Sequence, residues 1–270
     1  MAWYWQVLIA VLASAGAGIG TGFVGLSAAV FIVPPLVGFL GMEAYDAVSI
    51  ALAADVLASA VSAFNYRKEG NIDIKNGKYL LISVIIFTVV GSYIGSIVPH
   101  RAMGFVAIVG SLLLGLKFLF FPGNAMQPFH AKSSRRKITE SLVGGVLIGL
   151  VCGFMGTGGG MMMLLVLNLF LGYELKCAVG TSVFVMTFSA LVGSLSHFFI
   201  GGFHWEGVGG RGIDPWLILG VCVVATLIFA HCSAKIANKI KPRNLTLTTG
   251  ALLTLSSAIM LIFHWIKIAV

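Results

Sequence analysis

The stretch GFMGTGGGMMM, at residues 153–163, decides how this chain folds. It places three consecutive glycines, Gly158–Gly160, between two strongly apolar segments. Close packing between helices does not need three glycines in a row. Backbone that leaves the helix at membrane depth is tolerated only where protein or a water-filled cavity satisfies its polar groups. The stretch therefore predicts a helix that is broken inside a membrane.

The composition of the whole chain supports a membrane environment. Hydrophobic residues make up 59% of the 270 residues and charged residues only 10%, whereas about a quarter of a soluble domain is charged. Apolar runs fill most of the chain, and ~20 residues are enough to span a bilayer. We expect an all-α polytopic protein of the inner or plasma membrane. The net charge of +8 does not indicate a nucleic-acid partner, because the basic residues sit in short loops between apolar segments, as the positive-inside rule requires.

The sequence also repeats itself. A shift of 131 positions aligns the chain with itself without a gap, which indicates a duplicated half rather than a solenoid. We predict a first repeat at 1–125, a linker at 126–137 and a second repeat at 138–270. The aligned positions include Gly18, Gly22, Phe23 and Gly25 with Gly149, Gly153, Phe154 and Gly156, and Gly41 with Gly172.

The distribution of Lys and Arg predicts that the two repeats have opposite orientations. The loop after the third apolar segment is basic, and its counterpart at 200–214 is not; for the next pair of loops the bias is reversed. Under the positive-inside rule, the linker at 122–138 is then cytoplasmic and both termini are outside. The basic residues of the two rich loops are Arg67, Lys68, Lys75 and Lys78, and Lys235, Lys239, Lys241 and Arg243.

Inversion requires an odd number of crossings in each half, and we assign five. The stretches 4–41 and 139–172 are too long for one span and are interrupted by glycines, so each is expected to contain a helix followed by a half-length segment. The ten expected segments are 4–22, 24–41, 45–66, 79–98, 102–121, 139–155, 158–172, 175–198, 215–235 and 245–266.

Inverted repeats with helices broken at matching positions are typical of a transporter binding site. The free N–H groups at the start of a half-helix carry partial positive charge and favour an anion. We expect Gly156–Gly160 and the matching Gly25–Ala29 to face each other near the bilayer midplane. The evenly spaced glycines elsewhere, such as Gly18 with Gly22 and Gly145 with Gly149, are expected to serve helix packing.

These motifs resemble the TauE/SafE family of sulfite and organosulfonate exporters. The resemblance lies in GFMGTGGGMMM, AVGTSVF (178–184) and SHFFIGGFHW (196–205), with a weaker copy in GFVGLSAAVFIVP, YDAVSIALAADV and YRKEGNID. It covers nearly the whole chain and implies outward transport of a small sulfur-containing anion. The first half departs from the pattern, since Ser27-Ala28-Ala29 replaces the glycine run and Ser49-Ile50-Ala51 replaces Gly-Thr-Ser. The two half-sites are therefore unequal.

The hydroxyls of Thr181 and Ser182 can donate to sulfonate oxygens, or can instead bond back to carbonyls of their own helix. Together with the breaks and their mirrored side, they complete the predicted substrate site. Its residues are Gly25, Leu26, Ser27, Ser49, Gly156, Thr157, Gly158, Gly159, Gly160, Thr181 and Ser182.

Four further polar residues are candidates for coupling or gating. Asp55 lies in the middle of the third segment, where an ionisable group is costly. Asn65 and Tyr66 align with Ser196 and His197 across the repeat, and the imidazole of His197 can carry a proton near neutral pH.

Several function classes are disfavoured. The four cysteines form no CxxC pair and no metal-ligand cluster, so no metal or cofactor is expected. The glycine run lacks the Lys-Ser/Thr of a phosphate-binding loop, so we expect no ATPase and no enzyme. A thiol–disulfide carrier is disfavoured because the first half has no cysteine.

The open alternatives are a transporter of a carboxylate or metal ion and a passive anion channel. The expected partners are a small anion, the lipid bilayer, coupling protons or ions, and a second copy in a homodimer.

Overall fold

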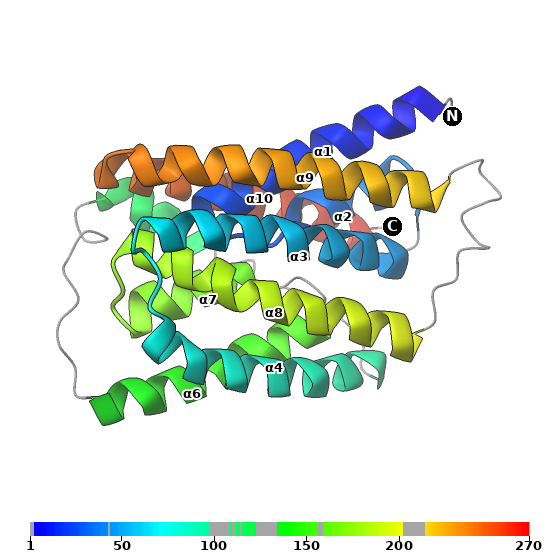
Figure 1. Ribbon diagram of the computed structural model, residues 1–270. Helices are drawn as coiled ribbons and strands as arrows, with labels where there is room; N and C mark the ends of the chain where they lie inside the picture. Colours follow the sequence, from blue (N-terminus) through cyan, green and yellow to red (C-terminus); the bar gives the residue numbers. More distant parts are fainter. Residues whose placement is uncertain are drawn as a thin grey trace.

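The computed structural model describes residues 3–42, 44–97, 109, 112–113, 115–122, 134–155, 159–201 and 214–269. Within these residues the chain forms helices and connecting turns, as the composition predicts (Figure 1). The elements are α1 (Trp3–Val24), α2 (Ala29–Gly38), α3 (Ala44–Lys68), α4 (Ile74–Ile97), α6 (Ser134–Met155), α7 (Gly160–Leu165), the π-helix η2 (Val166–Phe170), α8 (Leu175–Gly201), α9 (Pro215–Lys239) and α10 (Pro242–Ala269).

Within the described residues, four helices are long and apolar enough to cross a bilayer, and shorter apolar helices occur at Gly77–Gly91 and Ile138–Gly153. Many large apolar side chains face outward on these helices: Leu12 is 64% exposed and Ile228 is 55% exposed. Such a surface suits lipid rather than water. The chain is therefore a multi-pass membrane protein. The four long spans are Trp3–Val24, Asp46–Lys68, Leu175–Ser196 and Pro215–Lys239.

The expected half-length segments are confirmed. The stretch at 4–41 is divided into the long α1 and the short α2, and the stretch at 139–172 into α6 and the short α7 with η2. α2 contains Pro34 and Pro35. The expected segment at 102–121 lies largely outside the described residues, although residues 115–120 are helical.

Element boundaries recur at the interval found in the sequence. α1 ends at Val24 and α6 at Met155; α2 begins at Ala29 and α7 at Gly160. In each of these pairs the separation equals the shift that aligns the chain with itself. The starts of α3 and α8 are separated by the same interval. Local chain structure thus follows the sequence repeat.

The helices pack as pairs around a central pair. α3 and α8 lie side by side in the middle, α1 packs on α9, and α4 packs on α6 (Figure 1). The predicted packing glycines occupy these contacts. Gly18 lies against Thr226 and Ala230 of α9, and Gly149 lies against Val84 and Thr88 of α4. These contacts confirm that the evenly spaced glycines serve close helix packing.

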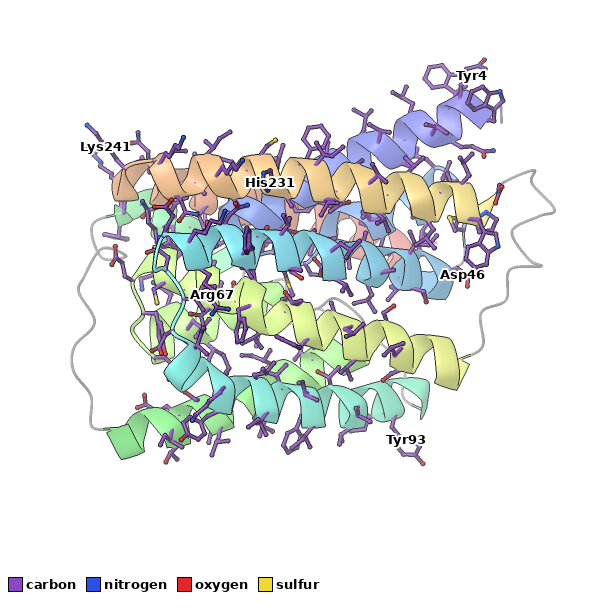
Figure 2. The ribbon with its side chains drawn as sticks, in the orientation of Figure 1. Tyr4, Asp46, Arg67, Tyr93, His231 and Lys241 are labelled. Atoms are coloured by element: carbon purple, nitrogen blue, oxygen red, sulfur yellow. The ribbon has the colours of Figure 1, made fainter. Side chains whose placement is uncertain are left out.

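Basic side chains gather at one end of the bundle. Figure 2 labels Arg67 and Lys241 at the left-hand end, and Tyr4, Asp46 and Tyr93 toward the opposite end. Lys235 and Lys239 near the end of α9 are exposed as well. Both chain termini are marked in the right-hand half of Figure 1. The loops that are rich in Lys and Arg in the sequence therefore share one end of the molecule.

Candidate functional site

The first helix break joins α1 to α2. Gly25 follows the last residue of α1 with φ +68°, and its N–H donates to the Thr21 carbonyl at 2.9 Å. A residue in this left-handed conformation ends a helix, and glycine adopts it without steric cost. Leu26 and Ser27 then cross the break in fully buried positions. The side chain of Ser27 accepts the Ala29 N–H at 3.3 Å.

The second break joins α6 to α7. Gly159 is the N-cap of α7 and has φ +68°, and α7 leads directly into η2. Three predicted site residues in this break, Gly156, Thr157 and Gly158, lie outside the described residues.

The two breaks touch. A methyl group added at Gly160 would collide with the Gly25 carbonyl oxygen and come within 2.7 Å of the Ser27 nitrogen. A methyl group added at Gly25 would in turn meet the Ser182 hydroxyl of α8. The structure thus brings together Gly25, Ser27, Gly160 and Ser182, which the sequence analysis had grouped in one site. Approach this close is possible because Gly25 and Gly160 carry no side chain.

The two hydroxyls on α8 make different contacts. The Ser182 hydroxyl donates to the Val179 carbonyl at 2.8 Å, so the back-bonded alternative holds for this residue in the described conformation. Thr181 instead accepts the backbone N–H of Asp73 at 3.1 Å. Both side chains are fully buried. Thr181 therefore faces the loop between α3 and α4, whereas Ser182 faces the first break.

The loop between α3 and α4, residues 69–73, covers the start of α8 at the basic end. The carbonyl of Asn71 lies against Gly180. The carboxylate of Asp73 accepts the Tyr173 hydroxyl at 3.0 Å, and the Asn71 side chain donates to Asn238 at 2.9 Å. These contacts were not predicted from the sequence, although Asn71 and Asp73 belong to the YRKEGNID motif. In the described conformation this loop therefore covers Thr181.

Asp55 faces the first break from α3. It is fully buried, and the polar groups that act on its carboxyl are the Ser27 side chain, the Ala28 N–H and the Thr21 side chain. None of these approaches with the length and angle of a regular hydrogen bond within the described part of the chain. Thr21 was not predicted as a site residue, because a threonine within an apolar helix gives no signal of its own in the sequence.

The other residues predicted for the substrate site or for gating lie away from the contact between the two breaks. Ser49 is buried on α3, nearer to the start of that helix than Asp55. The Tyr66 hydroxyl donates to the Gly22 carbonyl at 3.0 Å and so ties α3 to α1. The side chain of His197 lies outside the described residues.

Asn65 is paired with a residue that the sequence analysis did not select. Its amide nitrogen lies 3.2 Å from the His231 ring of α9, and Figure 2 shows His231 part of the way along that helix rather than at its end. At the shift of 131 positions His231 aligns with His100, and this match, which was not used in selecting candidates, is the sequence signal that could have found it. The pair ties α3 to α9.

No group of three or more His, Cys, Asp or Glu side chains that could hold a metal ion occurs within the described residues. The polar groups at the breaks are instead neutral: backbone N–H groups and the Ser27 and Ser182 hydroxyls. Such groups suit an anion.

Comparison with known proteins identifies the family. The family model described as "Sulfite exporter TauE/SafE" matches residues 10–260. The chain is 23% identical over 229 residues to the "Probable membrane transporter protein YdhB" of Bacillus subtilis (strain 168), covering 82% of this chain and 86% of that protein. It is 26% identical over 220 residues to the "Probable membrane transporter protein YunE" of the same organism, covering 74% and 80%. No solved structure matches the chain.

Proposed function

This chain belongs to the TauE/SafE family of membrane transporters, and from that premise we propose that it carries a small sulfur-containing anion, such as sulfite or an organosulfonate, across the cell membrane. The contact between the two helix breaks carries this proposal. The breaks bring the backbone of two chain segments, one from each half of the sequence, into contact at one buried point beside the Ser27 nitrogen. Export is the direction that the family description names.

The anion is held by neutral donors in this proposal. The backbone N–H of Ser27 donates to none of the described carbonyls in the turns and loops. At the start of α7, the first N–H groups lack acceptors within their own helix, as at every helix start. Helix dipoles add partial positive charge at both places without a permanent cation. An anion held in this way can also be released, which a carrier requires.

The predicted binding set keeps the residues of both breaks. Gly159, Gly160 and Leu26 provide the backbone, and Ser182 provides a hydroxyl that can turn from the Val179 carbonyl to the anion. Thr181 becomes available when the loop at 69–73 moves away. Gly156, Thr157, Gly158 and Ser49 remain predicted members of the set.

Two inverted repeats, 1–125 and 138–270 joined by the linker 126–137, would allow access to alternate between the two sides of the membrane. Three observations support this. Helix boundaries of the first half recur in the second half at the interval of the sequence repeat. α3 and α8 run in opposite directions (Figure 1). α1 packs on α9 as its counterpart α6 packs on α4. The bond between Asn65 and His231 joins the two halves and would have to rearrange as they move, so Asn65 is assigned to gating. Tyr66, whose bond to Gly22 lies within the first half, and His197 remain predicted gating residues.

A thermal-stability screen of the purified protein tests the substrate class. Sulfite, taurine and sulfoacetate are expected to raise the unfolding temperature, whereas acetate, succinate and divalent metal ions are not. A ligand at 100 times its Kd stabilises the folded state by ~2.7 kcal/mol. Stabilisation by carboxylates or metal ions alone would assign the same fold to another substrate. Saturable flux and counterflow in proteoliposomes then separate a carrier from a passive channel.

The topology is tested by cysteine labelling in a background without native cysteines. Lys241→Cys at the basic end is expected to react with a membrane-impermeant maleimide only after the membrane is opened, because basic loops face the cytoplasm. Tyr4→Cys at the opposite end is expected to react in intact cells. Both side chains are exposed, so neither fails to react because of burial. The reverse labelling pattern would overturn the proposed orientation.

A further inference from the structure

The strongest unexplained feature inside the bundle is the carboxyl group of Asp55. This side chain is 0% exposed, and neither of its oxygens has a regular hydrogen-bond partner among the described residues. An ionised carboxylate is strongly disfavoured in such a place unless it is paired. The groups acting on it include no Lys, Arg or His side chain. The surroundings of this carboxyl therefore favour a form in which its charge is neutralised.

The direction of the neighbouring hydrogen bonds indicates what neutralises it. The Thr21 hydroxyl donates its hydrogen to the Leu26 carbonyl at 2.9 Å, so it offers Asp55 a lone pair. Ser27 uses its oxygen to accept the Ala29 N–H, so its own hydrogen is free to point at Asp55. Ala28 adds a backbone N–H. The carboxyl thus meets two donors and one acceptor.

This set matches a protonated carboxyl group. A carboxylate has acceptor sites only, whereas a protonated carboxyl has one O–H donor in addition to its acceptor sites. The O–H can donate to Thr21, and the other oxygen can accept from Ser27 and Ala28. A metal cation fits less well, because the Ala28 N–H directs partial positive charge at the same carboxyl. The carbonyls of Thr21, Ser27 and Ala28 also already accept backbone N–H groups.

We propose that Asp55 binds the proton that travels with the anion, so that protonation of Asp55 and occupancy of the neighbouring break favour each other. The inference rests on the proposed function, because the anion site is placed at the break that Asp55 faces. An anion at Ser27 and Gly160 is repelled by a charged Asp55 and is tolerated by a neutral one. Linkage is reciprocal, so the anion also raises the affinity of Asp55 for its proton.

Thr21 couples the two events mechanically. Its single hydrogen can serve either the Leu26 carbonyl or the Asp55 carboxylate, but not both. When Asp55 is protonated, Thr21 donates to Leu26 and holds the break in the described geometry. When Asp55 loses its proton, the Thr21 hydroxyl turns to the carboxylate and releases Leu26. Proton loss therefore loosens the backbone beside Gly25, where the anion is placed.

Other titratable groups contribute little to the electrostatic environment of the Asp55 carboxyl. Cys152 of α6 is close enough to be affected by charge on Asp55. α2 carries no titratable residue. None of the remaining side chains that are described acts on the Asp55 carboxyl. On the elements packed against α3, these remaining titratable residues are Tyr4 of α1, Lys176 and Cys177 of α8, and Cys222, His231, Cys232, Lys235 and Lys239 of α9. The side chain of His197 of α8 lies outside the described residues.

Binding of methanesulfonate, which stays a monoanion across the working pH range, tests the proposal on the full-length protein. The wild type is expected to take up one proton per bound anion from weak buffer and to lose affinity about tenfold per pH unit where Asp55 titrates. Asp55→Asn, a neutral isostere, is expected to bind with a pH-independent affinity and no proton uptake. The matched control, Asp46→Asn, changes a buried carboxyl at the start of the same helix and should behave as the wild type.

The outcomes separate this inference from the proposed function. Proton uptake that persists in Asp55→Asn, or binding that requires Na⁺ and takes up no proton, overturns the inference and leaves the anion site standing. If no sulfonate or sulfite binds, the proposed function fails. A second measurement reports the proton on Asp55 without any variant. It records the infrared carbonyl band of a protonated aspartic acid in the wild-type protein, and the band is assigned with isotope-labelled aspartate. Absence of that band at mildly acidic pH overturns the inference even if Asp55→Asn does not fold.

Discussion

Gly160→Ala is expected to weaken sulfite and sulfonate binding about tenfold or more, which corresponds to a loss of ~1.4 kcal/mol in binding free energy. The added methyl group would collide with the Gly25 carbonyl and approach the Ser27 nitrogen to 2.7 Å. Because the neighbour is backbone rather than a flexible side chain, the two breaks must separate. Donors from both breaks then no longer converge on one anion. Losing one charge-assisted hydrogen bond costs ~1.5–3 kcal/mol.

Two glycine-to-alanine controls show whether the effect belongs to the site. Gly220, within α9, has open space around its Cβ position, so Gly220→Ala should leave both binding and stability nearly unchanged. Gly149→Ala should lower the unfolding temperature and retain the affinity, because this glycine packs against α4. Isothermal titration and thermal unfolding supply both readouts. If Gly160→Ala binds sulfite with unchanged affinity, the anion does not sit between the breaks.

Gly159 is a poorer position for this test. Its φ of +68° belongs to the left-handed region, which a β-branched residue such as valine strongly disfavours. Gly159→Val would therefore destabilise the start of α7 whether or not the site binds an anion. Loss of binding in that variant would not separate strain from loss of the site. Gly160, which lies inside the helix, avoids this difficulty.

The second large effect is expected for folding. Gly25→Ala should lower the free energy of unfolding by ~2–3 kcal/mol, because the substitution combines two costs. The first is the positive φ of +68°, which an alanine tolerates at a cost of about 1 kcal/mol or more. The second is contact with the Ser182 hydroxyl and with the Val179 carbonyl at 3.4 Å.

A matched set of variants separates these two costs. Gly70 has φ +72° and nothing within 4 Å of its Cβ position, so Gly70→Ala measures backbone strain alone. Ser182→Ala removes the hydroxyl that Gly25→Ala would displace. The double variant is therefore expected to recover about 1 kcal/mol relative to the sum of the single changes. The free energies are measured by denaturant titration in mixed micelles. If Gly25→Ala costs no more than Gly70→Ala and shows no coupling to Ser182, the first break does not pack on α8 as described.

The sequence alone determined the parts of this protein that depend on local chemistry. Apolar runs located the spans, since hydrocarbon excludes unpaired backbone and charge. The self-alignment of the two halves located the paired boundaries, such as Val24 with Met155. Glycine identified the breaks, because Gly25 and Gly159 occupy a backbone conformation that other residues avoid. The sequence also identified which loops are rich in Lys and Arg.

The tertiary structure alone decided which polar groups meet. Thr181 accepts a hydrogen bond from Asp73, 108 positions away, and Asn65 pairs with His231, 166 positions away. A hydroxyl or amide has several possible partners, and its choice depends on which helix faces lie within about 3 Å of each other. The sequence marked Asp55 as costly inside the membrane, but not that Thr21, Ser27 and Ala28 surround it. Thr21 belongs to α1 and the other two to the segment that links α1 to α2, and only the packing of α3 against α1 and α2 brings them to the carboxyl.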